Sequence, residues 1–159
     1  DLIISTTEGM RGFVTEEDVL AAGYQSIGDG GEPGQYTHYV NWSYLYDEFE
    51  LDAAHIESIV MKMNADGTSR VVSAMYILTV GKTIDDAPEL AGEITTWHDH
   101  DNLCFEGTSL VGLAVNGVCE VGVLINTPPM LHVWVEANLC GPFVGIDEHG
   151  LVCEETDLH

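Results

Sequence analysis

The chain has 159 residues, with 27 Asp and Glu against four Lys and Arg, so its formal net charge at pH 7 is −23. Such a chain has little with which to neutralise phosphate groups, which argues against nucleic acid and anionic membrane surfaces as partners. Its length indicates a single domain, residues 1–159, and 17 glycines with few helix-period runs indicate a β-rich fold. This acidity is typical of proteins from saline sources, and recruitment of cations such as Ca²⁺ is the alternative explanation.

The N-terminal part predicts a strand, a helix and an aromatic segment. Residues 2–7 are apolar and β-branched, which predicts a terminal strand. Thr15 precedes three acidic residues and an apolar run, a pattern typical of a short capped helix that ends at Gly23. Tyr44 and Tyr46 are two apart in the aromatic segment, so we expect them on one face of a strand. Core packing is the favoured explanation of these aromatic residues, with a ligand-binding wall as the alternative.

The clearest hairpin signal is Asp66-Gly67, a favoured two-residue turn between alternating arms. Pairing outward from Ala65 and Thr68 places apolar side chains on one face, which is the predicted core. These side chains are Ile59, Met61, Met63, Val72, Ala74, Tyr76 and Leu78.

A second turn pair, Asn116-Gly117, predicts that residues 94–125 form a three-stranded meander. Its register pairs Val115 with Val118. Two prolines then end the third strand and lead to another alternating segment.

Cysteine usage and a sequon indicate a protein outside the cytoplasm. An even number of cysteines fits two disulfides in an oxidising compartment, and the pairing stays open. In the meander register, Cys104 and Cys119 lie beyond the roughly 7 Å Cα limit of a disulfide, so that pairing needs an irregular turn. Asn41 begins a glycosylation sequon. The candidate disulfide residues are Cys104, Cys119, Cys140 and Cys153.

The start of the chain and its hydropathy support the same location. The chain begins at Asp1 without a leader, so we expect a processed chain or one that omits its signal peptide. No stretch reaches the ~18 apolar residues that a membrane helix needs. We therefore predict an extracellular or cell-surface glycoprotein without a membrane span.

Three histidines form the strongest candidate site. His98 and His100 are two apart, so on a strand they point the same way. Residues 130–136 alternate, with an apolar face and His132 on the opposite face. Together these strands could supply three neutral imidazoles, a common coordination shell for zinc, copper, iron or nickel. The competing explanation is a solvated strand face that binds nothing, and His38 is the best candidate for an extra ligand.

The same region resembles the metal motif of the cupin family in its spacing. The run GEITTWHDH matches the first half, although five residues separate it from Glu106 where the motif has fewer. The second half is matched in outline, with Met130 in place of a glycine. The resemblance implies a double-stranded β-helix. The ligands it implies are His98, His100 and His132, with Glu106 as a fourth.

Four segments resemble a different family, an uncharacterised group of secreted proteins from actinobacteria and other prokaryotes. They are AAGYQSIGDG, VVSAMYILTVG, WHDHDNLCF and PMLHVWVEANLCGPF. The likeness spans most of the chain from residue 15 onward. It implies an exported, disulfide-bearing single domain, and it transfers no activity.

The sequence thus favours a mainly β fold, an antiparallel β-sandwich or a cupin-like barrel with one short N-terminal helix. Its favoured function is binding of a divalent metal. A metal-dependent enzyme of unknown substrate is one alternative, although no nucleophile elbow, phosphate-binding loop or dinucleotide fingerprint occurs. Another is a structural cell-surface or filament subunit that self-associates by strand exchange through residues 2–6. Acidic clusters at 85–89 and 99–102 lack the spacing of a calcium loop.

Overall fold

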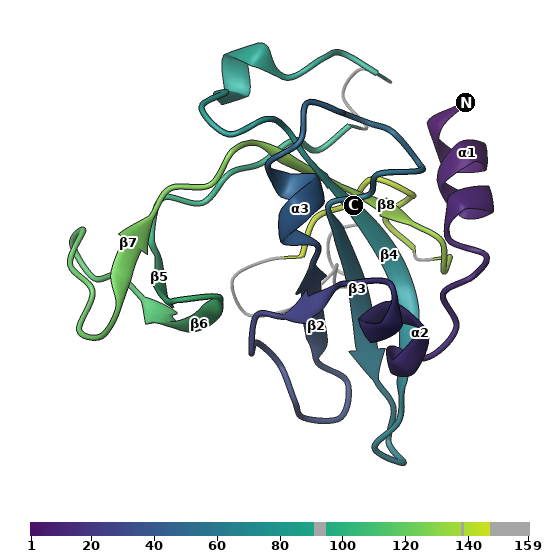
Figure 1. Ribbon diagram of the computed structural model, residues 1–159, viewed down its shortest axis with the longest axis horizontal. Helices are drawn as coiled ribbons and strands as arrows, with labels where there is room; N and C mark the ends of the chain where they lie inside the picture. The colour runs from purple at the N-terminus through teal and green to yellow at the C-terminus, as the bar shows by residue number, and fades with distance from the viewer. Residues whose placement is uncertain (91–94, 138, 147–159) are drawn as a thin grey trace.

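The computed structural model describes residues 1–90, 95–137 and 139–146, and these form two antiparallel sheets (Figure 1). The large sheet has the order β1-β2-β3-β4-β8, and the small sheet has the order β6-β5-β7. The prediction of a mainly β fold is confirmed, and the two sheets are consistent with a β-sandwich-like arrangement. The strands are β1 (Gln25–Ser26), β2 (Tyr36–Val40), β3 (Ser58–Met63), β4 (Ser69–Ile77), β5 (Leu103–Glu106), β6 (Ser109–Leu113), β7 (Val123–Ile125) and β8 (Met130–Trp134).

Short helices accompany the sheets. The predicted helix after Thr15 is confirmed as α2. Thr15 accepts a hydrogen bond from the Asp18 N–H, and the Asp18 carboxylate accepts one from the Thr15 N–H. In the described ranges, no helix is long and apolar enough to cross a membrane. The helical segments are α1 (Leu2–Gly9), α2 (Glu16–Ala21), α3 (Trp42–Leu45) and a 3₁₀ turn at Ile84–Asp86.

The prediction of a terminal strand at residues 2–7 is wrong, because these residues lie in α1. Asp1 caps the helix by accepting a hydrogen bond from the Ile3 N–H at 2.9 Å. Thr6 is fully buried, and its hydroxyl lies 2.7 Å from that of Tyr76 in β4. Packing of one helix face on the large sheet thus outweighs the local β-propensity. Strand exchange through this segment loses its structural basis.

The aromatic segment also differs from its prediction, because Trp42–Leu45 form helix α3. The side-chain oxygen of Asn41 accepts hydrogen bonds from the N–H groups of Ser43 and Tyr44, at 3.1 and 3.3 Å, and so starts the helix. Tyr46 follows the helix and is exposed. Asn41 is only 6% exposed. Since this side chain acts as a helix cap, the structure gives no support to its glycosylation.

The β3–β4 hairpin confirms the turn at Asp66-Gly67, but next to the turn the strands pair one residue out of the predicted register. The Asn64 N–H donates to the Thr68 carbonyl at 2.7 Å, so pairing starts one residue away from the predicted register. A β-bulge beside Val60 then restores the register, and Val60 pairs with Ser73 as predicted. Ser73 is fully buried, which shows that the sheet is covered on both faces.

Two core clusters lie on the opposite faces of the large sheet. The first contains four of the predicted core residues and packs against side chains of α1 and α2. The second contains Val60, Met75, Ile77, Met130 and Trp134. Val72, predicted for the first cluster, belongs to the second because of the bulge. The predicted residues in the first cluster are Ile59, Met61, Ala74 and Tyr76.

The predicted meander over residues 94–125 is wrong in its strand order. β5 begins at Leu103 and pairs with both β6 and β7, so it is the middle strand of the small sheet. The turn at Asn116-Gly117 is confirmed by a bridge between Val115 and Val118. Beyond that bridge the chain crosses to the far side of β5. The predicted start of the meander, residue 94, lies outside the described residues.

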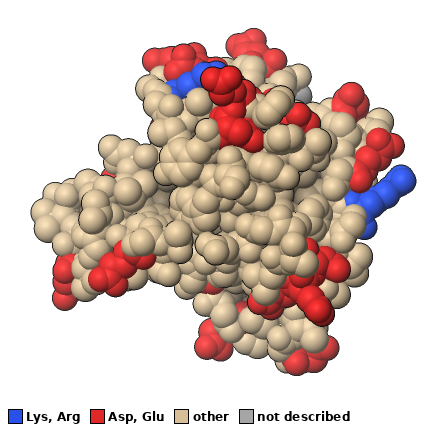
Figure 2. Space-filling view, viewed as in Figure 1, with Lys and Arg blue, Asp and Glu red and all other residues tan. Residues whose placement is uncertain are grey.

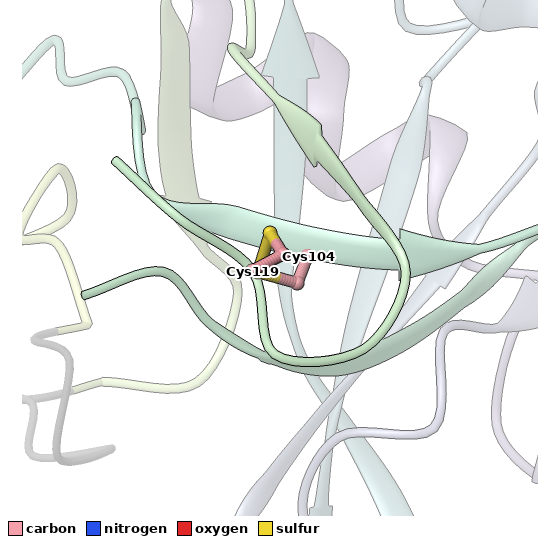
Figure 3. The surroundings of a disulfide bond; sticks show 2 residues. All are labelled: Cys104 and Cys119. Atoms are coloured by element: carbon pink, nitrogen blue, oxygen red, sulfur yellow. A yellow bond between two sulfur atoms is a disulfide. The ribbon is translucent and has the colours of Figure 1, made fainter. Parts of the chain in front are cut away.

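A disulfide joins Cys104 to Cys119, with Cα atoms 5.7 Å apart (Figure 3). The irregular geometry that this pairing needs is present, because a β-bulge lies between Cys104 and Phe105. The bond ties the segment after the turn to β5, which accounts for the crossing. Cys140 is also disulfide-bonded, and Cys153 lies outside the described residues.

Cys104 and Cys119 are 15 residues apart in the sequence, so their bond closes a loop of that length in the unfolded chain. Replacing both by alanine is therefore expected to lower the free energy of unfolding by about 3 kcal/mol. Urea unfolding followed by tryptophan fluorescence measures the loss. The control is Ser109→Ala, at an exposed position of β6, for which we expect a change within about 0.5 kcal/mol. Equal stabilities of the double variant and the wild type would contradict the expectation.

Candidate functional site

His132 is the most buried histidine of the described residues. It lies in β8, where Leu131 and Val133 face the first core cluster, so His132 points to the opposite face, as the alternation predicts. The residue is 1% exposed. Within the described part of the chain, neither ring nitrogen has a hydrogen-bond partner. A buried polar atom without a partner costs about 1–3 kcal/mol, so this side chain requires an explanation.

His98 and His100 reach His132 from the segment that leads into β5. His98 forms two backbone hydrogen bonds with Met130 at the start of β8, at 3.1 and 2.7 Å. The His100 carbonyl accepts a hydrogen bond from the Thr127 N–H. The ring centre of His98 lies 5.4 Å from that of His100 and 5.2 Å from that of His132. The three imidazoles therefore meet, as their spacing predicts.

His38 adds a fourth imidazole from β2. Its ring centre lies 5.8 Å from that of His132. The Nδ1 atom lies 2.7 Å from the Asp29 carboxylate, which also accepts a hydrogen bond from the His38 backbone N–H at 2.9 Å. When a carboxylate accepts a hydrogen bond from one ring nitrogen, the ring orientation is fixed and the other nitrogen, which carries no proton, is left to bind a metal ion. Histidine ligands of metal centres are commonly supported in this way.

The surroundings favour neutral imidazoles. Burial holds the pKa of His132 well below its ordinary value, and the positive charges that the neighbouring histidines can carry lower it further. Burial and then His100 lower the pKa of His98, while burial and then His38 lower the pKa of His100. Neutral imidazole is the form that binds a metal ion or accepts a hydrogen bond from a ligand.

The rings are gathered but are not arranged as a coordination shell. His98 and His132 are stacked, with 3° between their planes, whereas a metal ion lies in the plane of each ring that binds it. Among the residues that the structure describes, no group of three or more His, Cys, Asp or Glu is placed to hold a metal ion. This applies equally to the acidic clusters considered for Ca²⁺. Glu106, the fourth ligand that the cupin resemblance implies, is exposed at the end of β5.

A cavity of about 670 Å³ lies beside the histidines. Its walls come from both sheets, with Met75 and Met130 on the large sheet and Phe105 and Leu110 on the small sheet. Asp29 is the one charged side chain among the described residues that line it. All four histidines of the cluster also line it, so the cavity and the cluster form one site.

The cavity and the part played by Asp29 were missed by reasoning from the sequence. Asp29 lies in the glycine-rich loop before the strand of His38, and an acidic residue there is the signal that could have indicated a partner. Core packing is confirmed for Tyr39, in the first core cluster, and for Tyr44, which packs against it, whereas Trp42 and Tyr46 line the cavity. His55 lies elsewhere, with its Nδ1 atom 2.9 Å from the Asp47 carboxylate.

Comparisons with protein-family models, curated proteins and solved structures found no match. The likeness to the cupin motif and to the secreted prokaryotic family therefore stays a prediction. Function must be inferred from the geometry of the site.

Proposed function

We propose that the chain binds a divalent transition-metal ion through His98, His100 and His132, with His38 as a fourth imidazole. The observation that carries the proposal is His132, which is 1% exposed and whose two ring nitrogens have no partner among the described residues. An ion bound to one of these nitrogens offsets part of the cost of burying them. The rings of His38 and His98 lie beside that of His132, and the ring of His100 lies beside that of His98.

The chemistry of these donors selects the class of ion. Neutral imidazole suits zinc, copper, iron and nickel, whereas Ca²⁺ takes oxygen ligands. The contact between Asp29 and His38, at 2.7 Å, supports the choice because a carboxylate on one ring nitrogen holds a histidine ligand in a fixed orientation. Which of these four ions the protein binds in its own surroundings depends on their availability as much as on their affinity for the site.

Binding requires at least one ring to turn. His98 and His132 are stacked, so both cannot direct an in-plane nitrogen to one ion without rotation. The terminal torsion of a histidine side chain is soft, and His98 borders open cavity volume into which its ring can move. The turn is therefore small in cost compared with the binding energy of a metal ion.

A metal-dependent enzyme is the second candidate, and the cavity favours it. If only His98, His100 and His132 bind the ion, a coordination position stays open to the volume of the cavity. Catalytic metal sites use such a position for water or substrate. A carrier or a metal-stabilised domain needs no opening, so an exchangeable water on the bound ion, detected by water-proton relaxation, would favour the enzyme.

We further propose that the protein works outside the cytoplasm. The disulfide between Cys104 and Cys119 supports this location, because such bonds persist in oxidising compartments.

Metal titration of the purified protein tests the main proposal. Chelator-treated protein is titrated separately with Zn²⁺, Cu²⁺, Ni²⁺ and Fe²⁺ in about 0.5 M salt, which screens weak binding to the acidic surface. Bound metal is measured after gel filtration. We expect about one ion per chain. In His98→Ala and His132→Ala, affinity is expected to fall at least about tenfold.

The matched control is His55→Ala. It removes a histidine that also contacts a carboxylate, that of Asp47, but that is not among the described residues lining the cavity. This variant is expected to bind metal like the wild type. Absence of stoichiometric binding for all four ions, or an equal loss in the control, would overturn the proposal.

A further inference from the structure

We infer that the cavity between the two sheets binds an uncharged, largely apolar organic molecule whose single hydroxyl group meets His132. Occupation of the cavity is separate from metal binding and is expected in the metal-free protein. The ligand class follows from three properties of the site: its volume, its charge and its unpartnered polar atoms.

The volume and walls of the cavity suit a small organic molecule. About 670 Å³ lies within the range of roughly 300–1,000 Å³ that such sites have. A cavity of this size between two sheets leaves room for a small organic molecule. The side chains that bound it are mainly apolar, among them Met75, Ile77, Leu103, Phe105 and Leu110. These favour a hydrocarbon body.

The charge of the lining disfavours a charged organic molecule as the occupant of the cavity. Among the described residues that line the cavity there is no Lys or Arg, so a carboxylate or phosphate finds no counter-ion there. The single acid, Asp29, already contacts His38 at 2.7 Å, so a cation finds no free carboxylate. On the side of the molecule that Figure 2 shows, acidic side chains lie mainly toward the margin and far outnumber basic ones. An uncharged molecule is therefore favoured.

The unpartnered nitrogens of His132 define the polar end of the ligand. A neutral imidazole has one N–H donor and one acceptor nitrogen, and in the described structure neither is used. A hydroxyl group both donates and accepts, so it can satisfy either nitrogen. An alcohol or phenol is thus the complementary class, with its hydroxyl at His132 and its hydrocarbon part against the small sheet.

Displacement of a fluorescent probe tests this inference. N-phenyl-1-naphthylamine is uncharged and becomes fluorescent in apolar surroundings. In the presence of EDTA it is expected to bind saturably with a Kd of roughly 1–50 µM. Competition then compares 1-decanol with decanoate, which have the same chain length and differ in the end group. Decanol is expected to displace the probe at a concentration at least about tenfold lower than decanoate does. The cavity has no Lys or Arg among its described lining residues to offset the cost of burying a carboxylate.

Two tryptophan variants locate the binding. Leu110→Trp fills the cavity from β6 and is expected to weaken probe binding at least about tenfold. The matched control is Val123→Trp on β7 of the same sheet, at a residue 67% exposed and not among the described lining residues. This control is expected to bind within about twofold of the wild type. Ile125→Trp, which fills the cavity from another strand, replaces Leu110→Trp if near-ultraviolet circular dichroism shows that the latter is unfolded.

Three results would overturn the inference: no saturable binding of the probe, equal displacement by decanol and decanoate, or loss of binding in Val123→Trp but not in the cavity-filling variant. The last would place the probe on the exposed face of the small sheet. Because EDTA is present throughout, a failure of metal binding leaves these outcomes unchanged.

Discussion

The metal-free His132→Phe variant is expected to be more stable than the metal-free wild type and to bind no metal. Phenylalanine occupies nearly the space of histidine and carries no polar side-chain atom. In the wild type both ring nitrogens are buried without a partner among the described residues, and each such atom costs about 1–3 kcal/mol. After allowance for imperfect packing, we expect the free energy of unfolding to rise by about 2 kcal/mol.

Thermal unfolding in the presence of chelator measures this effect, as an increase in Tm of roughly 4–8 °C for a chain of this length. Addition of the ion identified by titration is then expected to raise the Tm of the wild type, because it binds the folded state alone. The Tm of His132→Phe is expected not to respond. Wild-type histidine would thus be retained at a cost in stability for the sake of binding.

His38→Phe is a control for which we expect a change in stability opposite to that of His132→Phe. His38 has a partner, the Asp29 carboxylate at 2.7 Å, so its replacement leaves that carboxylate without its side-chain contact. We expect this variant to lose stability in chelator. If His132→Phe also loses stability, the nitrogens of His132 are satisfied in the folded protein, and the main reason for placing a ligand there is removed.

A loss of stability between about pH 4.5 and pH 8 is the second large effect that we expect, and it arises from Glu57. Glu57 is 1% exposed. One carboxylate oxygen accepts a hydrogen bond from the Ile77 N–H at 3.1 Å, and the other has no partner in the described structure. Burial raises the pKa of Glu57 to about 8, the hydrogen bond from Ile77 opposes this, and the nearby Asp47 and Glu50 add to it.

The direction follows from the protons bound in each state. Between the two pKa values, folded Glu57 holds a proton that the unfolded chain has released, so raising the pH favours unfolding. The stabilisation is complete below about pH 4.5 and is lost as the pH rises through about 8. Each pKa unit corresponds to about 1.4 kcal/mol, so the loss is on the order of 5 kcal/mol. This is a large part of the roughly 5–15 kcal/mol that stabilises a domain.

Glu57→Gln isolates the contribution of this group, because glutamine is uncharged at every pH and all other acidic groups are unchanged. Urea unfolding is measured for both proteins across the pH range. The free energy of unfolding of the variant is expected to exceed that of the wild type by on the order of 5 kcal/mol at about pH 9 and to match it near pH 4.5. Glu50→Gln is the control. Burial acts to raise the pKa of Glu50, but hydrogen bonds from Lys82 and Thr79 outweigh it and lower this pKa, so removal of the carboxylate should destabilise the protein at neutral pH. A difference for Glu57→Gln that does not vary with pH would show that Glu57 is ionised when folded.

The sequence predicts the histidine cluster well because alternation on a strand is a local property. His132 lies between two apolar residues that face a core, so its side was fixed by its neighbours. His98 and His100 precede β5 and lie outside the strands, so the predicted strand there is wrong and alternation does not account for the contact between their rings. Their approach to His132 depends on a backbone pairing between His98 and Met130, which are about thirty residues apart. Local patterns make that pairing plausible, but only the tertiary structure determines it.

The errors have a common physical origin in tertiary packing. Residues 2–7 have β-propensity, yet burial of Thr6 against Tyr76 stabilises a helix. In the small sheet β7 pairs with β5, to which Cys119 is also bonded through Cys104, and the turn residues do not encode this strand order. A cavity is the space left between two sheets, and no residue pattern specifies such a space.

The most direct test of the central claim is a crystal structure of the metal-loaded protein with anomalous scattering data at the absorption edge of the ion. We predict a single strong peak about 2.0–2.1 Å from a ring nitrogen of each of His98, His100 and His132, with at least one ring turned out of the stacked arrangement. Peaks confined to acidic side chains on the surface, with the four rings unmoved, would contradict the account.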